Sequence, residues 1–388
     1  MRTLVDYRPA LRSRTGVGEY VHELARALVR TQPLAGNPAD ALFLFSSSWS
    51  DRLDPGVVPG ATAIDCRVPV QMLNYAWHRW GWPPVELLTS ALGGRPDRQF
   101  DAVQSLHPLL MPSRHAAQLV TIHDLDFLDH PERTAAEIRR DYPALARIHA
   151  HRADRVITVS QFTAGEIHQR LEVDPSRIAV CSPGAPDWVA REAEPVNGYV
   201  LFLGTLEPRK NVGTLIEAYA RLVTRHAHRP QQTGTPRLVL AGRAGDGTAA
   251  WLQQLQTAPL AGRVDLPGYV APEDRRALMA GAAVLVLPSF MEGFGIPVLE
   301  AMTLGVPVIV SNRGALPEVA GDAGLTFDPA APDELSALLE RVLDDRDLRR
   351  GMSERGRVRA RAYSWDQTAA RTRDAWQQAI DARRRARG

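Results

Sequence analysis

The chain has 388 residues, which exceeds one ordinary hydrophobic core and predicts two domains of roughly 150–200 residues each. Hydrophobic residues make up 45% and charged residues 23% of the chain, a composition typical of globular proteins. The 46 basic and 44 acidic residues nearly balance, which argues against a protein that neutralises nucleic-acid phosphates.

Short apolar runs alternate with helical patterns along the chain, which predicts an α/β architecture with parallel sheets. In the first half we expect strands at Thr3–Asp6, Ala41–Phe45, Ala102–Gln104, Leu119–Ile122, Arg155–Val159 and Ile178–Val180. We expect helices at Gly18–Thr31, Thr134–His151 and Gln161–Leu171. Ser160 suits the N-cap position of the last helix.

The second half shows the same alternation more clearly. We expect strands at Tyr199–Leu203, Arg237–Ala241, Ala283–Leu287 and Val306–Val310. The amphipathic stretches between and around them predict helices at Val212–Arg225, Ala249–Gln256, Pro272–Ala280 and Ile296–Leu304. Nearly continuous apolar strands such as Val-Leu-Phe-Leu are what a sheet covered on both faces requires.

Two Pro-containing stretches, Ser182–Pro186 and Glu194–Gly198, bracket a segment without sustained periodicity. This pattern is typical of an interdomain linker. We therefore place one domain at residues 1–190 and a second at residues 191–365, followed by a basic C-terminal helix at residues 366–388.

The strongest local signal is the segment Glu-Gly-Phe-Gly-Ile-Pro-Val-Leu-Glu, from Glu292 to Glu300, which follows an apolar strand and enters a helix. Gly293 and Gly295 allow the backbone to approach a ligand, and free N–H groups at the helix start favour an anion. Because Glu300 lies inside the helix and Glu292 precedes it, the two carboxylates can contact different parts of one ligand. The alternative is a solvated glutamate at Glu292 and, at Glu300, an ordinary carboxylate near the N-terminal end of a helix.

A second signal is Gly-Thr-Leu-Glu-Pro-Arg-Lys-Asn, from Gly204 to Asn211, which also follows a strand and precedes a helix. Arg209 and Lys210 together can neutralise a diphosphate through charge-assisted hydrogen bonds worth about 1.5–3 kcal/mol each. A solvated basic turn is the alternative. The position after a parallel strand favours the functional interpretation, because ligands bind at that edge of open α/β sheets.

These two segments, together with Ser311–Val319 and Asp322–Pro329, resemble the retaining glycosyltransferases of family 4. The resemblance covers nearly the whole chain, most specifically residues 199–330, and is strongest to bacterial mannosyltransferase-like members of polysaccharide pathways. It implies the GT-B fold, in which two Rossmann-like domains face each other across a donor-binding cleft. Residues 1–190 would then form the acceptor domain, residues 191–365 the nucleotide-sugar donor domain, and the C-terminal helix would pack back towards the first domain.

The resemblance also implies roles for the matching residues. Arg209 and Lys210 would bind the donor diphosphate and stabilise the leaving group, Glu292 would contact the sugar hydroxyls, and Glu300 would accept hydrogen bonds from the ribose. The implied catalytic set is His123, Glu292, Arg209 and Lys210. The implied donor-binding set is Gly16, Gly18, Arg209, Lys210, Glu292, Gly293, Phe294, Gly295 and Glu300.

Weaker signals lie in the first half. Arg-Thr-Gly-Val-Gly-Glu-Tyr, ending at Tyr20, resembles the family's N-terminal Gly-rich loop, with a plain helix-capping loop as the alternative. Val21 stands where a dinucleotide fingerprint needs a third small residue, which argues against an NAD oxidoreductase. His123 ends a predicted strand where the family has a functional histidine beside the donor sugar, and a structural histidine is the alternative.

Asp124-Leu-Asp126 spells a metal-binding pattern of another glycosyltransferase fold. We reject that interpretation and expect neither a metal nor another cofactor, because in GT-B enzymes Arg, Lys and a helix terminus stabilise the charge instead. Cys66 and Cys181 lack metal-ligand spacing, so we expect two reduced thiols rather than a zinc site.

The stretch Met72–Pro84 contains Trp77, Trp80 and Trp82. It predicts either a helix with its aromatics in the core, or an element that contacts the acceptor or a membrane surface. The N-terminus lacks the apolar segment of a signal peptide, and no run approaches the ~20 apolar residues of a membrane span. We expect a cytoplasmic protein, with peripheral membrane association as the finer alternative.

The resulting hypothesis is a hexosyltransferase that acts with retention and moves mannose from GDP-mannose, or a sugar from a UDP donor, to a saccharide or lipid-linked acceptor. We see no enzymic nucleophile, so we favour same-face attack in which the departing phosphate takes the acceptor proton. The alternatives are an NDP-sugar epimerase or phosphorylase of the same fold, and a non-catalytic nucleotide-sugar-binding protein.

Overall fold

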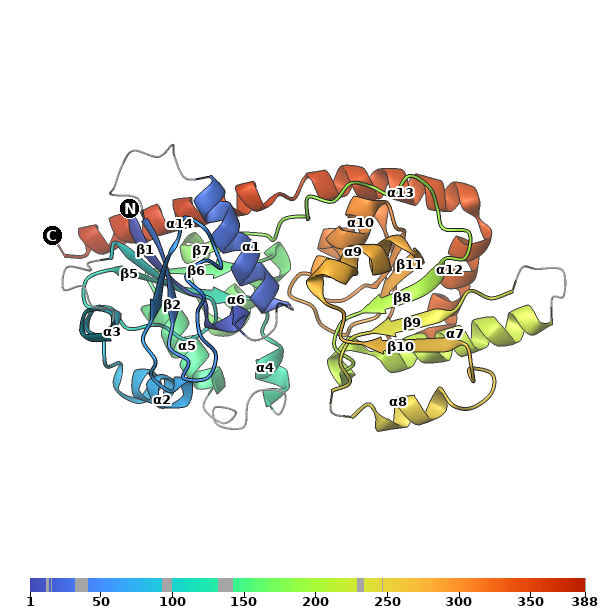
Figure 1. Cartoon of the computed structure of the whole chain (residues 1–388), viewed down its shortest axis with the longest axis horizontal. Coiled ribbons are helices and arrows are strands. Elements are labelled where there is room, and N and C mark those ends of the chain that lie inside the picture. The colour runs from blue at the N-terminus through green and yellow to red at the C-terminus, as the bar shows by residue number, and fades with distance from the viewer. Residues whose placement is uncertain are drawn as a thin grey trace. The chain divides into compact units, whose positions relative to one another are not determined.

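The computed structural model describes residues 1–11, 14, 16–31, 41–92, 100–131, 142–228, 234–245 and 247–387. The chain divides into unit 1, made of Met1–Gly184 and Trp365–Gly388, and unit 2, Ala185–Ser364 (Figure 1). The sequence placed the first boundary after residue 190. The structure places it after Gly184, because the segment from Ala185 to Arg191 is bonded to unit 2. The Ala185 N–H donates to the Tyr363 carbonyl at 3.0 Å, and the Arg191 guanidinium donates to the Ala282 carbonyl at 2.6 Å.

Unit 1 contains a parallel sheet in the order β3-β2-β1-β4-β5-β6-β7, so the strand order reverses between β1 and β4. Its strands are β1 (Arg2–Asp6), β2 (Ala41–Ser46), β3 (Thr62–Asp65), β4 (Ala102–Ser105), β5 (Ala117–Ile122), β6 (Arg155–Thr158) and β7 (Ile178–Val180). The strands β1, β2, β4, β5 and β6 are buried on both faces, as their apolar runs predict, whereas the edge strands β3 and β7 are only partly buried. The sequence did not predict β3, a short strand that pairs with β2.

The described helices of unit 1 cover this sheet (Figure 1). They are α1 (Val17–Arg30), α2 (Val70–Trp80), α3 (Val85–Leu92), α4 (Asp126–Asp129), α5 (Tyr142–Arg152), α6 (Gln161–Leu171) and α14 (Trp365–Arg385). The Ser160 hydroxyl accepts a hydrogen bond from Thr163 N–H, which confirms the predicted N-cap of α6. Residues 134–141 of the helix predicted from Thr134 lie outside the described residues.

The C-terminal helix α14 packs against α1 and β5. The Trp376 indole N–H donates to the Gln104 side-chain oxygen at 2.8 Å, and an Arg373 Nη donates to the Thr31 hydroxyl at 2.8 Å. A helix at the end of the chain therefore completes the core of the domain in which the chain begins.

Unit 2 contains a second parallel sheet in the order β10-β9-β8-β11-β12-β13, with its reversal between β8 and β11. Its strands are β8 (Tyr199–Leu203), β9 (Leu238–Ala241), β10 (Val264–Gly268), β11 (Ala282–Leu287), β12 (Val308–Ser311) and β13 (Leu325–Phe327). The edge strands β10 and β13 were not predicted. Both are short, and β10 includes Pro267, which is tolerated at a sheet edge.

The helices of unit 2 follow the strands in alternation (Figure 1). They are α7 (Val212–Ala227), α8 (Ala249–Gln254), α9 (Pro272–Ala280), α10 (Ile296–Leu304), α11 (Leu316–Ala320), α12 (Pro332–Asp344) and α13 (Arg346–Arg361). The bounds of α9 and α10 are those predicted from the sequence. Both units are Rossmann-like, so the predicted α/β fold class is confirmed.

Candidate active site

The loops that follow β8 and β11 meet where the strand order of unit 2 reverses. The Phe290 N–H donates to the Arg209 carbonyl at 2.9 Å, which joins the two loops. Asn211, in a left-handed conformation with φ of 53°, donates from its amide to the carbonyls of Pro288 at 3.1 Å and Pro329 at 2.8 Å. Reversal points of this kind are where open α/β sheets bind their ligands.

Three charged side chains converge at this point. Lys210 Nζ lies 2.6 Å from Glu292 Oε1, and Arg209 Nη1 lies 3.7 Å from Glu292 Oε2. The Ser289 hydroxyl also donates to Glu292 Oε1, at 2.7 Å. Burial alone would raise the pKa of Glu292, but the charges of Lys210 and Arg209 outweigh burial and hold this pKa below its usual value. The structure thus brings together three of the predicted catalytic residues.

The cations reach this position through the turn Pro208–Lys210, a short 3-10 helix. Arg209 is oriented by two further contacts, one from its guanidinium to the Met291 carbonyl at 3.1 Å and one to the Glu207 carboxylate at 3.2 Å. The planar Arg209 guanidinium is therefore held beside Oε2 of Glu292, while the Lys210 ammonium contacts Oε1.

The backbone around Glu292 is shaped by glycines. Gly295 caps α10 with φ of 107°, a conformation that glycine adopts without strain. A Cβ at Gly314 would lie 2.6 Å from the Glu292 carbonyl oxygen, so only glycine fits there. The Phe294 side chain is buried and packs edge-on against Tyr363. Only its backbone is therefore suited to contact a ligand, together with Gly293 and the first turn of α10.

Glu300 has a separate set of partners. It lies on α10 with 4% of its surface exposed, and its Oε1 accepts from Arg275 Nη1, on α9, at 2.8 Å. Its Oε2 is buried and has no hydrogen-bond partner among the described residues. Burial raises the pKa of Glu300 above its usual value, and Arg275 opposes this shift. A buried carboxylate oxygen without a donor is costly, and a ligand hydroxyl would satisfy it.

The predicted site residues of unit 1 lie around the start of α1. Gly16 is the N-cap of α1 with φ of 53°, and Gly18 is buried in its first turn. His123, at the end of β5, meets the Tyr20 ring edge-to-face at 5.1 Å, and its Nε2 donates to the Leu106 carbonyl at 3.3 Å. Burial lowers the pKa of His123 to about 4. The imidazole is therefore neutral at pH 7 and keeps an acceptor lone pair on Nδ1.

The comparisons with known proteins agree with this geometry. The model of "Glycosyltransferase Family 4" matches residues 14–187, and that of "Glycosyl transferases group 1" matches residues 189–359. The O-antigen chain mannosyltransferase B of Escherichia coli is 34% identical over 279 residues, which cover 69% of this chain and 71% of that protein. The chain belongs to glycosyltransferase family 4. It is therefore an enzyme that transfers hexosyl groups.

Two further proteins place this family 4 enzyme among its relatives. The MMP alpha-(1->4)-mannosyltransferase of Mycolicibacterium hassiacum is 33% identical over 238 residues, covering 60% of this chain and 56% of that protein. The structure of Anabaena HepE, solved with UDP and glucose, aligns with a TM-score of 0.68 at 16% identity over 96% of this chain and 98% of HepE. The likeness to HepE shows the GT-B fold.

The family 4 enzyme also has a charged cluster that the sequence did not single out. At the reversal point of the unit 1 sheet, the fully buried Asp6 accepts two hydrogen bonds from the Arg8 guanidinium, at 2.8 and 2.7 Å, and a third from the Arg8 backbone N–H at 3.1 Å. His107 Nε2 lies 3.2 Å from Asp6 Oδ2, and the Arg8 guanidinium stacks on the Trp77 ring at 5.1 Å. Burial would raise the pKa of Asp6, but Arg8 holds it far below its usual value. The sequence signal that could have indicated this cluster is an acidic residue at the end of a predicted strand, two residues before an arginine.

The Asp124-Leu-Asp126 segment forms a local turn. The Asp126 N–H donates to Asp124 Oδ1 at 3.2 Å, which opens the short helix α4. Among the described residues, the cluster with metal-ligand spacing includes neither aspartate. The rejection of a metal site there stays a prediction.

Both cysteines, Cys66 and Cys181, are buried. Burial raises the pKa of Cys181 to about 11, so that thiol is protonated at neutral pH.

The tryptophan-rich stretch divides between core and surface. Helix α2 ends at Trp80 because Gly81 takes a left-handed conformation, so the stretch Met72–Pro84 is only partly helical. Trp77 is 2% exposed and donates from Nε1 to the Pro83 carbonyl at 2.8 Å. Trp80 and Trp82 are 65% and 54% exposed. The expectation that these aromatics pack in the core is wrong for Trp80 and Trp82.

We expect Glu300→Gln to raise the KM for the donor by about 10- to 100-fold, with a smaller change in kcat, because a charged acceptor of a hydrogen bond contributes about 1.5–3 kcal/mol to binding. Steady-state kinetics with the donor varied at saturating acceptor give both parameters. Glu273→Gln, in the first turn of the neighbouring α9, is the control. An unchanged donor KM in Glu300→Gln would refute the assigned role.

Proposed function

We propose that this enzyme moves mannose from GDP-mannose, with retention at the anomeric carbon, to a saccharide or lipid-linked acceptor in polysaccharide biosynthesis. The observation that carries the proposal is the cluster of Arg209, Lys210 and Glu292 at the reversal point of the unit 2 sheet. The mannosyltransferase names of the two curated relatives favour mannose. UDP-sugars are the second donor class, because HepE was solved in complex with UDP and glucose.

In the proposed complex, the negative diphosphate pairs with the positively charged Arg209 and Lys210, whose side chains lie beside Glu292. Glu292 is then available to accept hydrogen bonds from the sugar hydroxyls. The backbone of Gly293–Gly295 and the first turn of α10 present N–H groups to sugar or phosphate oxygens. Glu300 Oε2, which has no donor among the described residues, accepts from a ribose hydroxyl.

For the chemical step we propose same-face attack. The bond from the anomeric carbon to the diphosphate oxygen breaks, the acceptor oxygen forms the new bond on the same face, and the acceptor proton passes to the leaving phosphate. Charge develops on the diphosphate as the bond breaks, so preorganised cations beside it lower the barrier most. Arg209, Lys210 and the N-terminal end of α10 supply the compensating positive charge in place of a metal ion. The neutral His123 contributes as a hydrogen-bond acceptor for a sugar hydroxyl.

A thermal-shift screen with GDP, UDP, ADP and TDP, each with its sugars, tests the donor. A ligand at about 100-fold above its Kd should raise the Tm by about 5–10 °C. NMR of the product formed with the selected donor then gives the anomeric configuration. Retained configuration supports the proposal, and an inverted product contradicts it. Isomerised donor without acceptor would indicate an epimerase, phosphate-dependent cleavage a phosphorylase, and binding without turnover a sensor.

We further propose that unit 1 associates peripherally with a lipid surface. Among the described residues, the structure contains no helix that combines the length and the apolar character of a membrane span. Exposed apolar side chains nevertheless gather on and beside α2, where Tyr75 and Trp80 meet edge-to-face at 5.6 Å. A group of exposed aromatic side chains on one part of the surface favours contact with a membrane interface.

We expect the wild type to float with liposomes that contain anionic lipid, and the double variant Trp80→Ala/Trp82→Ala to lose most of this association. The reason is that both exposed indoles would enter the interface and account for much of its apolar contact. Val358→Ala, which removes an exposed apolar side chain from unit 2, is the control. Failure of the wild type to float would remove the proposal.

A further inference from the structure

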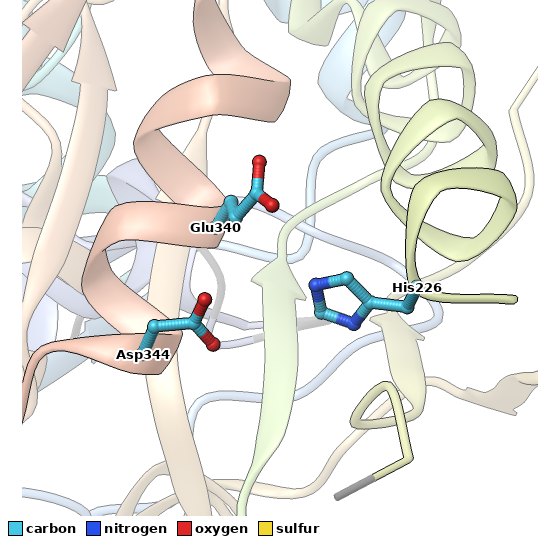
Figure 2. A group of neighbouring side chains, drawn as sticks. All are labelled: His226, Glu340 and Asp344. Atoms are coloured by element: carbon cyan, nitrogen blue, oxygen red, sulfur yellow. The ribbon is translucent and has the colours of Figure 1, made fainter. Parts of the chain in front are cut away.

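A cluster of potential metal ligands lies in unit 2, away from the proposed donor site, where α7 and α12 end (Figure 2). His226 is in the last turn of α7, and Glu340 and Asp344 are four residues apart on α12, hence on one face of that helix. One imidazole nitrogen and one oxygen from each carboxylate all lie within 4.8 Å of one another. The packing of α7 against α12 brings together residues more than 110 positions apart in the sequence.

The His226 imidazole is oriented as a metal ligand would be. Its Nδ1 lies 3.0 Å from the Thr235 hydroxyl oxygen, and we assign the Nδ1 proton to this hydrogen bond. The Nε2 then carries a lone pair. That nitrogen is buried, has no hydrogen-bond partner among the described residues, and faces the two carboxylates in Figure 2. Metal-binding histidines in proteins are held in the same way, by a hydrogen bond from the other ring nitrogen.

The local electrostatics also favour a cation. Both α7 and α12 direct their C-terminal ends, which carry partial negative charge, towards the cluster. Glu340 Oε2 lies 3.2 Å from Arg225 Nε, so an ion would share Glu340 with this arginine or displace it. Arg225 would keep its other contact, from Nη2 to the Ser336 hydroxyl at 2.7 Å.

We propose that His226, Glu340 and Asp344 form a binding site for one divalent transition-metal ion, with Zn²⁺ as the best-fitting class. One imidazole and two carboxylates are a ligand set that zinc accepts, and imidazole disfavours Mg²⁺ and Ca²⁺. Zinc–ligand distances of about 2.0–2.2 Å place neighbouring ligand atoms about 3–3.5 Å apart. The ligand atoms of the cluster lie within 4.8 Å of one another, so side-chain rotations that shorten these separations by up to about 1–2 Å would close them around an ion.

The position of the site defines its role. Helix α7 leaves the carboxyl edge of the sheet after Asn211 and ends at Ala227, before β9 enters from the amino edge. The cluster therefore lies at the edge of the unit 2 sheet opposite the loops that carry Arg209 and Glu292. An ion there joins the ends of two packed helices and stabilises the donor domain. It takes no part in the transfer reaction, so the proposal does not depend on the donor chemistry.

The test titrates Zn²⁺ into the full chain after treatment with a chelator, with binding measured by calorimetry and stability by thermal unfolding. We expect one ion per chain, and a rise in Tm of about 5 °C or more at free zinc about 100-fold above Kd. His226→Gln and Asp344→Asn should each weaken binding by more than about 10-fold, and Thr235→Val, which removes the orienting hydroxyl, by about 10-fold.

His228→Gln is the matched control, since it removes an exposed histidine two residues from the site. It should bind zinc as the wild type does. Each variant is compared with its own metal-free form, so a change in basal stability does not obscure the metal effect. The proposal is overturned if the wild type binds no zinc, or if His226→Gln and Asp344→Asn both retain wild-type affinity, whatever His228→Gln does.

Discussion

Lys210→Ala and Arg209→Ala should each lower kcat/KM for hexosyl transfer by about 100-fold or more, equivalent to about 2.7 kcal/mol of transition-state stabilisation. Each variant loses one of the two cations that flank Glu292, at 2.6 Å for Lys210 and 3.7 Å for Arg209. In the wild type, each of these positive charges stabilises the negative charge that develops on the leaving diphosphate. Initial rates with the donor identified by thermal shift, at saturating acceptor, measure the effect.

Arg237→Ala is the control for these two variants, because it removes an arginine from an exposed ion pair with Asp265 in the same domain. It should keep near-wild-type activity, because exposed ion pairs contribute little. Thermal unfolding of all three variants separates a catalytic loss from a folding loss. Near-normal kcat in both Lys210→Ala and Arg209→Ala would remove the proposed mechanism.

Glu292→Gln should lower kcat by about 100-fold with a smaller effect on donor KM. The substitution keeps the shape of the side chain but removes the charge that positions Lys210 and Arg209, and it weakens the acceptor for the sugar hydroxyls. Because the neighbouring cations hold the pKa of Glu292 below its usual value, the wild-type carboxylate is ionised throughout the neutral range. The loss in kcat should therefore be constant between about pH 6 and 8.

The contrast with Glu300→Gln makes this prediction specific. Both residues are buried carboxylates in the same segment, but Glu292 contacts the proposed diphosphate ligands and Glu300 contacts Arg275. We expect the first variant to change mainly kcat and the second mainly donor KM. Equal effects on both parameters in the two variants would mean that the segment acts only through the stability of the loop.

Much of this architecture follows from local sequence patterns. The helices Gln161–Leu171, Pro272–Ala280 and Ile296–Leu304 have the predicted bounds, because each begins at a start signal, namely Ser160, Pro272 or Pro297. The edge strands β3, β10 and β13 were not predicted. Each is only three to five residues long, and it is pairing with a neighbouring strand that makes it a strand.

The site shows the same division between local and long-range information. The loops after β8 and β11 could be recognised separately, but the 2.6 Å contact between Lys210 and Glu292 spans 82 residues. It arises because β8 and β11 are neighbours in a sheet whose order the sequence does not state. The pairing of Glu300 with Arg275, and the amide of Asn211 that holds the loops together, depend on the same tertiary packing.

Calorimetric titration of the free nucleoside diphosphate isolates the central claim, because it removes the sugar, the acceptor and the chemical step. The wild type should bind the diphosphate of its donor, and the double variant Arg209→Ala/Lys210→Ala should bind it at least about 100-fold more weakly, since two charge-assisted contacts of about 1.5–3 kcal/mol each are lost. Equal affinity in the two proteins would contradict the assignment of the diphosphate to these cations.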